Sequence, residues 1–266
     1  MEIVGKKVLL TGATGGLGRA MAASLAFSGA KLILSGRDRD ALEGLASELA
    51  GDGHSVIPAD LGHAGAAIEL ATSAGPVDCL VANAALPSTG RLTELTDEQV
   101  SRMLRINLES PILLSQALLP GMLERGSGKL VMIGSLAGKT SSPRSSIYNA
   151  TKFGLRGFAL ALKADLAETG VDITLVAPGF VRGAGMFADS GADSPKGTGT
   201  TTPEKVAEAV DQAIRGDRAE IAVAPVFQRS LAHLASTSPT LSHRMQSGRA
   251  GQSAARKVAA GQADKR

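Results

Sequence analysis

Residues 7–18 read KVLLTGATGGLG, a short apolar run followed by a glycine-rich turn and the expected start of a helix. The glycines have the spacing G-x-x-x-G-x-G. Backbone amides in such a turn, and the helix dipole behind it, approach a pyrophosphate closely. A plain tight turn is the alternative explanation of the glycines. The position of the turn, at the first strand-to-helix junction of the chain, favours a dinucleotide site whose candidate contacts are Gly12, Thr14, Gly16, Leu17 and Gly18.

Short β-branched and Leu-rich runs alternate with Ala-rich segments of helical period along most of the chain. This alternation is typical of βαβ units around a buried parallel sheet. We expect seven strands, at Lys7–Thr11, Lys31–Ser35, Ser55–Ala59, Val77–Ala82, Lys129–Gly134, Asp172–Ala177 and Glu220–Val223. We expect helices near Gly16–Ser28, Arg39–Ala50, His63–Thr72, Asp97–Arg125, Ile147–Glu168 and Pro203–Arg215. The sequence therefore predicts an α/β fold, a Rossmann-type doubly wound parallel sheet of seven strands with helices on both faces, in a single domain.

Two segments break this pattern. Residues Gly183–Thr201 are rich in Gly, Ser, Thr and Asp, which favours a mobile loop that closes the pocket with Met186 and Phe187. After Phe227 we expect one or two amphipathic turns before Pro239, and disorder beyond Gly248. We therefore divide the chain into a dinucleotide-binding catalytic domain, residues 1–226, and a basic, partly disordered C-terminal tail, residues 227–266.

Composition narrows the class of protein. The chain has 266 residues, 44% of them hydrophobic, and a single cysteine, Cys79, so that a core without disulfides in a reducing, cytoplasmic compartment is expected. No apolar stretch approaches the roughly 20 residues that span a bilayer. The net charge is +3, but from Pro225 onward seven basic residues oppose one acid, so this segment carries +6 and the rest of the chain −3. Aromatic residues are only 3%. A nucleic-acid-binding body is therefore not expected.

The end of the second expected strand reads Ser35-Gly36-Arg37-Asp38. An acid at this strand end holds the 2′-hydroxyl of the adenosine ribose, whereas a cation accommodates a 2′-phosphate. Gly36 stands where the acid is expected and Arg37 follows it, which favours NADP over NAD. A solvated loop arginine is the alternative, and Asp38 is expected to cap the following helix.

Tyr148 and Lys152 are four residues apart at the start of an expected helix, so that phenol and ammonium share one face. A neighbouring ammonium favours phenolate and is expected to lower the tyrosine pKa from its ordinary value of about 10. The same lysine could hydrogen-bond the ribose hydroxyls of a nicotinamide nucleotide. An exposed helix pair is the alternative.

Two further polar residues lie where ligands of an open α/β sheet bind. Ser135 follows the fifth expected strand, where it could hydrogen-bond a carbonyl oxygen beside Tyr148. Asn107 lies inside the long expected helix, where asparagine is disfavoured. Taken singly, a turn serine and a residue at a helix kink explain both.

The combination of these residues resembles the short-chain dehydrogenase/reductase family over roughly residues 5–224. The matching features are T-G-x-x-x-G-x-G from Thr11 to Gly18, Asp60 after the third strand, Asn83-Ala84-Ala85 after the fourth, Asn107, Ser135, Tyr148 with Lys152, and Pro178-Gly179 after the sixth strand.

The resemblance implies a role for each of these positions. Tyr148 would be the general acid/base, Lys152 would tune it and orient the ribose, Ser135 would position the carbonyl or hydroxyl, and Asn107 would hold a relay water. The cofactor contacts implied are Asp60 and Leu61 at the adenine, Asn83 and Ala84 near the ribose, and Val181 at the nicotinamide amide, beside Pro178 and Gly179. No metal ion is expected.

Three departures from the family pattern stand out. The usual N-N-A-G is Ala82-Asn83-Ala84-Ala85, the usual threonine beyond Pro-Gly is Gly183, and the tail past Phe227 has no counterpart. Ala85 adds only a methyl group, so we expect the cofactor still to bind. The contact that the family's threonine makes to the nicotinamide carboxamide is not carried over to Gly183.

These features predict an NADP-dependent oxidoreductase that acts on a small-molecule carbonyl or alcohol. The resemblance also implies a homodimer or homotetramer paired through the helices that hold Asn107 and Tyr148. A non-catalytic dinucleotide-binding sensor or scaffold is the alternative. A third hypothesis gives the basic tail a peripheral association with anionic lipid.

Overall fold

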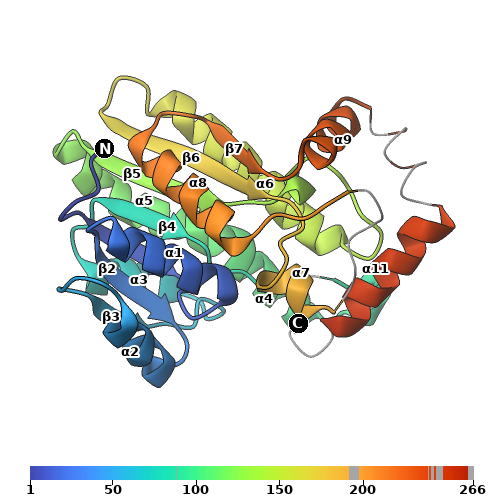
Figure 1. The fold of residues 1–266 in the computed structure, drawn as a ribbon, viewed down its shortest axis with the longest axis horizontal. Coiled ribbons are helices and arrows are strands. Elements are labelled where there is room, and N and C mark those ends of the chain that lie inside the picture. Colours follow the sequence, from blue (N-terminus) through green and yellow to red (C-terminus); the bar gives the residue numbers. More distant parts are fainter. Residues whose placement is uncertain (88, 192–197, 239, 241–242, 244–247, 263–266) are drawn as a thin grey trace.

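The computed structural model describes the chain except residues 88, 192–197, 239, 241–242, 244–247 and 263–266 (Figure 1). Its centre is a seven-stranded sheet of order β3-β2-β1-β4-β5-β6-β7, in which all neighbouring pairs are parallel. The strands are β1 (Lys7–Thr11), β2 (Lys31–Gly36), β3 (Ser55–Pro58), β4 (Cys79–Ala82), β5 (Gly128–Ile133), β6 (Val171–Pro178) and β7 (Glu220–Val223). The order reverses between β1 and β4, which is the switch point where ligands of doubly wound sheets bind. The fold class expected from the sequence is confirmed.

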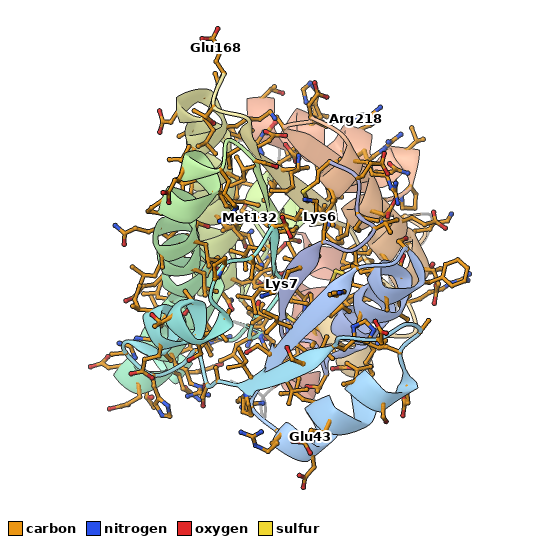
Figure 2. All side chains as sticks on the ribbon, turned by 90° about the vertical axis from the view of Figure 1, so that its left-hand side faces the viewer. Lys6, Lys7, Glu43, Met132, Glu168 and Arg218 are labelled. Carbon is orange, nitrogen blue, oxygen red and sulfur yellow. The ribbon has the colours of Figure 1, made fainter. Side chains whose placement is uncertain are left out.

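Helices cover both faces of the sheet, as the view toward the starts of the strands shows, with Lys6 and Lys7 near its centre (Figure 2). One face carries α1 (Gly16–Phe27), α2 (Arg39–Glu48) and α8 (Pro203–Arg215). The other face carries α3 (Ala66–Ala74), α5 (Ser110–Glu124) and α6 (Ser146–Asp165). Strand side chains alternate between two buried clusters: Val8 and Leu10 belong to the first and Leu9 to the second. This two-sided burial explains why the strands are continuous apolar runs in the sequence.

Local signals start the helices where the sequence predicts. The Asp38 carboxylate accepts a hydrogen bond from the Ala41 amide at 3.1 Å and caps α2. Thr202 caps α8 in the same way, with Pro203 in its first turn. Strand boundaries agree with the expectation within two residues and helix boundaries within three.

The long helix expected at Asp97–Arg125 has an interruption. It runs as α4 (Asp97–Leu104), a π-helical turn η2 (Arg105–Glu109) and α5. Such π turns are rare and cluster at functional sites. Asn107 lies in this turn and is buried, so the turn provides the reason for an asparagine in mid-helix.

The structure corrects two expectations about irregular segments. The segment Gly183–Thr201 was expected to be a loop, but it contains a short helix, α7 (Gly185–Asp189). Residues 192–197 of that segment lie outside the described residues. The tail forms a longer helix than expected, α9 (Val226–Thr237), and a second one, α11 (Arg249–Gly261), where disorder was expected. The alanine, glutamine and arginine of residues 249–261 are good helix formers, which explains the second correction. Among the described residues, no helix is long and apolar enough to cross a membrane.

Candidate active site

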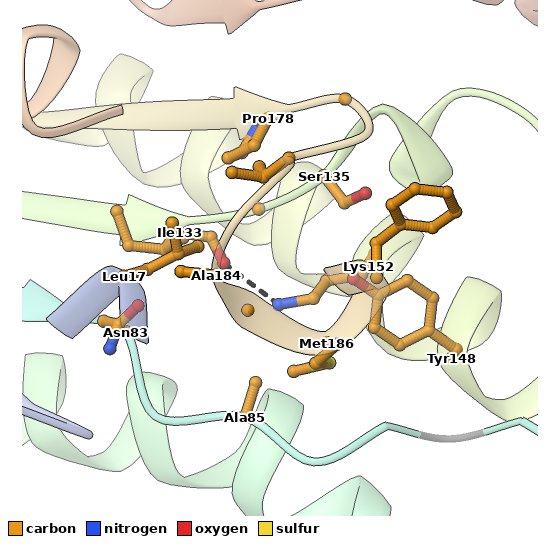
Figure 3. A pocket seen from close by; sticks show the side chains of 15 residues that line it. Leu17, Asn83, Ala85, Ile133, Ser135, Tyr148, Lys152, Pro178, Ala184 and Met186 are labelled. Carbon is orange, nitrogen blue, oxygen red and sulfur yellow. Dashed lines mark hydrogen bonds between the residues drawn. The ribbon is translucent and has the colours of Figure 1, made fainter. Parts of the chain in front are cut away.

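A pocket lies at the carboxyl ends of the strands, between the glycine turn after β1, the segments after β4 and β5, the start of α6 and the segment around α7 (Figure 3). Many of the residues singled out in the sequence line it: Leu17, Asn83, Ser135, Tyr148, Lys152, Pro178, Gly179 and Val181. Met186 and Phe187 of α7 also line it, as expected for the segment that closes the pocket. The candidate residues that do not line it are Gly12, Thr14, Gly16, Gly18, Arg37, Asp60, Leu61, Ala84 and Asn107.

The glycine turn is packed too closely for side chains. A Cβ at Gly18 would lie 2.1 Å from the Gly12 carbonyl oxygen, and a Cβ at Gly16 would lie 2.6 Å from the Ala184 Cβ. Gly12 itself has a φ of +64°, and a Cβ there would lie 2.9 Å from the Ala84 Cα. Only glycines fit this turn, and Gly15 and Gly16 are exposed at the start of α1, where unpaired helix amides attract a phosphate group.

Asn83 joins the segment after β4 to the glycine turn. Its side-chain amide donates hydrogen bonds to the carbonyl oxygens of Thr11 and Gly12 at 3.0 and 3.1 Å. In return, the Thr11 hydroxyl accepts from the backbone amides of Asn83 and Ala84, both at 3.0 Å. Asn83 and Ala84 therefore hold the segment after β4 against the glycine turn.

Ser135 and Tyr148 meet across the pocket. Ser135 caps the 3₁₀ turn η3 (Leu136–Gly138), and its hydroxyl oxygen accepts from the Ala137 amide at 3.1 Å. The hydroxyl also hydrogen-bonds the Tyr148 phenol, which by itself lowers the pKa of the phenol. Burial of Tyr148 has the larger effect, so the pKa of the phenol is raised above its ordinary value.

Lys152 lies one helical turn after Tyr148, with its Nζ 5.8 Å from the centre of the tyrosine ring. The side chain is 3% exposed and donates a hydrogen bond to the Ile133 carbonyl oxygen at 3.0 Å (Figure 3). Burial lowers the pKa of Lys152 to about 8. The expectation that this ammonium lowers the tyrosine pKa is therefore wrong for this structure: burial moves both groups toward their neutral forms.

Asn107 does not reach the pocket with its side chain. Its Oδ1 accepts from the Leu86 amide at 2.7 Å, and its Nδ2 donates to the Leu86 carbonyl oxygen at 2.9 Å. This pair of bonds holds the segment after β4 against the π turn. Asn107 therefore supports a wall of the pocket, since Ala85, next to Leu86, lines it.

The candidate adenine end of the cleft lies at β2 and β3. Arg37 is exposed after β2, and among the described residues no ion pair involves it. The Asp60 carboxylate pairs with Arg102 of α4 at 2.9 Å and accepts from the Gly62 amide, and these contacts hold its pKa below its usual value although burial opposes them. Leu61 is buried in the core, and its carbonyl oxygen accepts from the Ser110 hydroxyl.

Sequence reasoning missed two residues that support the site. Asn149, next to Tyr148, donates to the carbonyl oxygens of Ala137 and Thr140 and so holds the segment that carries Ser135. Gln228 of α9 accepts from the Phe180 amide, next to Gly179. An asparagine next to the Tyr148–Lys152 pair is a signal that could have been noticed, whereas nothing near Gln228 in the sequence marks it.

The residues present fit a nicotinamide dinucleotide. Gly16 and Gly18 lie in the first turn of α1 and Gly12 lies in the turn before it, so no side chain of these residues separates the helix amides from a pyrophosphate. Tyr148 and Lys152 lie beyond it along the same edge of the sheet, at the place where the nicotinamide end of an extended dinucleotide would reach.

Comparison with known proteins agrees with this fit. The sequence model of the short chain dehydrogenase family matches residues 6–195. A ketoacyl reductase of Nostoc sp., HetN, is 37% identical over 227 residues, which cover 83% of this chain and 79% of the relative.

Solved structures show the same likeness. A metagenomic short-chain oxidoreductase in complex with NADP has a TM-score of 0.71 at 29% identity. The match covers 85% of this chain and 99% of the chain in that structure. A 3-oxoacyl-(acyl-carrier-protein) reductase of Agrobacterium tumefaciens with NADP bound has a TM-score of 0.76 at 26% identity. The match covers 83% of this chain and 93% of the chain in that structure.

Proposed function

Because the chain belongs to the short-chain dehydrogenase family, and is thus an oxidoreductase with a nicotinamide cofactor, we propose that it is an NADP-dependent reductase of ketones in which Tyr148 is the general acid. The observation that carries this proposal is the meeting of Tyr148, Ser135 and Lys152 in one pocket at the carboxyl edge of the sheet. Relatives named as ketoacyl and 3-oxoacyl reductases support a ketone as the substrate.

When bound, the nicotinamide supplies the hydride in reduction and accepts it in oxidation. The Ser135 hydroxyl accepts from Ala137, so it can donate its own proton to the carbonyl oxygen of a substrate that replaces the Tyr148 phenol as its partner. Tyr148 donates the proton that converts this oxygen into the alcohol as negative charge develops on it. Burial raises the pKa of the phenol, so Tyr148 meets a carbonyl substrate in its protonated form and acts as the acid in reduction.

Lys152 is proposed to orient the nicotinamide ribose and to supply positive charge near Tyr148. A pKa of about 8 leaves the amine mostly protonated at pH 7. Asn107 is proposed to act behind this pair, through a water in the proton relay, while its side chain keeps the wall after β4 in place.

The preference for NADP rests on the end of β2. Gly36 leaves space near the Thr14 hydroxyl, since a Cβ on Gly36 would lie 3.4 Å from the Thr14 Oγ1, and Arg37 is exposed beside it. We propose that Arg37 pairs with the 2′-phosphate, and that Leu61 and Asp60, held by Arg102, border the adenine. The NADP-bound relatives support this assignment.

Arg37→Ala tests the cofactor preference. The Kd of NADPH is expected to rise roughly 10- to 100-fold, as for loss of one charge-assisted contact worth about 1.5–3 kcal/mol, with little change for NADH. Arg218→Ala is the matched control, because Arg218 is an exposed arginine in the loop before β7, at the opposite end of the strands (Figure 2). Equal weakening of both nucleotides by Arg37→Ala contradicts the assignment.

Tyr148→Phe tests the catalytic role. The variant removes only the phenolic oxygen, so NADPH binding is expected to persist while kcat falls by about 10²–10⁴. The measurement is NADPH consumption with a panel of ketones, beside nucleotide binding followed by fluorescence. Wild-type protein that binds NADPH and reduces no ketone of the panel would instead favour a dinucleotide-binding sensor.

We propose a homo-oligomer paired through α4 and α6, because Leu104 and Phe153 on these helices are 38% and 46% exposed. Light scattering of the purified protein tests it, and a monomer overturns it.

A cytoplasmic location is proposed from the single, buried Cys79, which requires no oxidising compartment.

A further inference from the structure

The last described residue of the chain, Gln262, lies far from the family's sequence motifs but next to the pocket. Its side chain is 3% exposed. The Thr89 hydroxyl donates to Gln262 Oε1 at 2.7 Å, and Gln262 Nε2 donates to the Met186 carbonyl oxygen at 2.7 Å. One buried amide therefore links the segment after β4 to helix α7, the two walls that face each other across the pocket.

Both linked segments carry residues that line the pocket. Met186 and Phe187 belong to α7, and Ala85 belongs to the segment that continues to Thr89. The Phe187 ring also packs against Phe180, with 4.7 Å between ring centres. A change in the position of the Met186 backbone would therefore move the apolar wall that faces Tyr148 (Figure 3).

The contact between the tail and α7 is closely fitted. Gly261 approaches the residue after α7 so tightly that a Cβ there would lie 2.0 Å from the Ser190 carbonyl oxygen. Ser190 in turn donates its hydroxyl hydrogen to the Phe187 carbonyl oxygen at 2.6 Å and ends the helix. The end of α11 lies beside α7 in the ribbon view (Figure 1), so the fit at Gly261 belongs to a specific docking of the tail.

A second glutamine of the tail, Gln228, contacts the chain both before and after α7. The Gln228 Oε1 accepts from the Phe180 amide at 3.2 Å, and its Nε2 donates to the Thr198 and Gly199 carbonyl oxygens at 3.1 and 2.7 Å. A Cβ at Gly179 would lie 2.2 Å from this Oε1. Gln228 thus holds the residues that flank α7 in the sequence, whereas Gln262 bonds α7 itself, at Met186.

We propose that Gln262 is a positioning residue for the substrate: it holds α7 against the segment after β4, and the C-terminal helix thereby limits the size of the ketone that the pocket admits. The inference rests on the proposed function, because it assigns the pocket to a ketone. It concerns a part of the chain beyond residue 195, where the family match ends. The linkage is polar and buried, so its loss leaves unpaired groups on both walls rather than a simple gap.

The first test measures the wall without any substrate. In the full-length Gln262→Ala variant, amide hydrogen exchange at residues 186–190 is expected to be roughly tenfold faster than in the wild type, as for loss of one buried hydrogen bond. Gln212→Ala is the matched control, because Gln212 is an exposed glutamine of α8. Unchanged exchange in Gln262→Ala overturns the linkage, whether or not the protein reduces ketones.

The second test uses turnover. For a series of methyl ketones of increasing chain length, Gln262→Ala is expected to raise the KM of the short ones roughly tenfold, to raise kcat/KM of the longest relative to the shortest, and to leave the Kd of NADPH unchanged. Thr89→Val removes the donor on the other wall and is expected to have the same effect, whereas Thr89→Ser keeps the hydroxyl and should restore wild-type behaviour.

The two tests separate failure of this inference from failure of the proposed function. A uniform fall of kcat for all ketones, with no change in the order of preference, overturns the role of Gln262 in substrate size. A wild type that reduces no ketone contradicts the proposed function and with it the substrate role, while faster exchange would still establish the linkage of the walls.

Discussion

Replacing Lys152 by methionine is expected to stabilise the protein at pH 7 while abolishing its activity. The folded protein holds this side chain 3% exposed, and burial lowers its pKa from 10.5 to about 8. One pKa unit corresponds to about 1.4 kcal/mol, so burying the ammonium costs roughly 3 kcal/mol at neutral pH. Methionine fills a similar volume without a charge.

Part of this gain is offset by the lost hydrogen bond to the Ile133 carbonyl oxygen, which we value at about 1 kcal/mol. The net expectation for Lys152→Met is a free energy of unfolding about 2 kcal/mol higher at pH 7. The direction with pH follows from linkage. Because the pKa of Lys152 is lower in the folded than in the unfolded state, the cost of burial is fully present below pH 8 and fades as the pH rises toward 10.5.

The assay is urea unfolding of wild type and variant at pH 7 and pH 10, with NADPH consumption measured in parallel. The advantage of Lys152→Met is expected to shrink from about 2 kcal/mol to near zero over this range. Lys205→Met, at an exposed lysine of α8, is the control for loss of a positive charge. A variant that is less stable than the wild type at pH 7, or an advantage that does not depend on pH, would refute the reasoning.

Three further substitutions have expected effects on stability, each measured by urea unfolding. Gly44→Ala is expected to stabilise by about 1 kcal/mol, because Gly44 lies inside α2 and an added Cβ would meet no atom within 4 Å. Gly18→Ala is expected to destabilise by about 3 kcal/mol and to weaken nucleotide binding, since its Cβ would lie 2.1 Å from the Gly12 carbonyl oxygen; a well-folded variant with normal binding would contradict this. Asp172→Asn is expected to cost about 3–5 kcal/mol, because it takes the counter-ion from the buried ammonium of Lys129, and a cost below about 1 kcal/mol would show that this pair is not needed.

The sheet and most helices could be predicted because their signals are periodic and local. Val8, Leu9 and Leu10 are buried on alternate faces of β1, so an unbroken apolar run is what a doubly covered strand requires. Caps such as Asp38 and Thr202 are equally local, since a side chain bonds an amide three residues later. The rule that strand ends of a parallel sheet share an edge places Ser135 at the ligand-binding edge, whereas its pairing with Tyr148, which lies in α6, was implied by the resemblance to the family.

What could not be predicted depends on burial and on contacts distant in the sequence. The spacing of Tyr148 and Lys152 predicts that they share a helix face, but it does not reveal that Lys152 is buried and Tyr148 half-buried. Likewise, Gln228 lies where only one or two amphipathic turns were expected, and Gln262 lies where the composition indicated disorder. Only the folded chain brings Gln262 to Met186, 76 residues earlier in the sequence.

The neutral tendency of the Tyr148–Lys152 pair has a physical consequence for how the site works. In water, an ammonium beside a phenol would favour phenolate, and the site would be poised to take a proton from an alcohol. Desolvation opposes both charges, which raises the pKa of the phenol and lowers that of the amine. The half-buried phenol, hydrogen-bonded to Ser135, therefore keeps its proton until charge develops on a carbonyl oxygen that can accept it. The burial that sequence spacing could not reveal therefore determines the form in which Tyr148 meets a carbonyl substrate, a protonated phenol, and the same group would take the proton back in the reverse reaction.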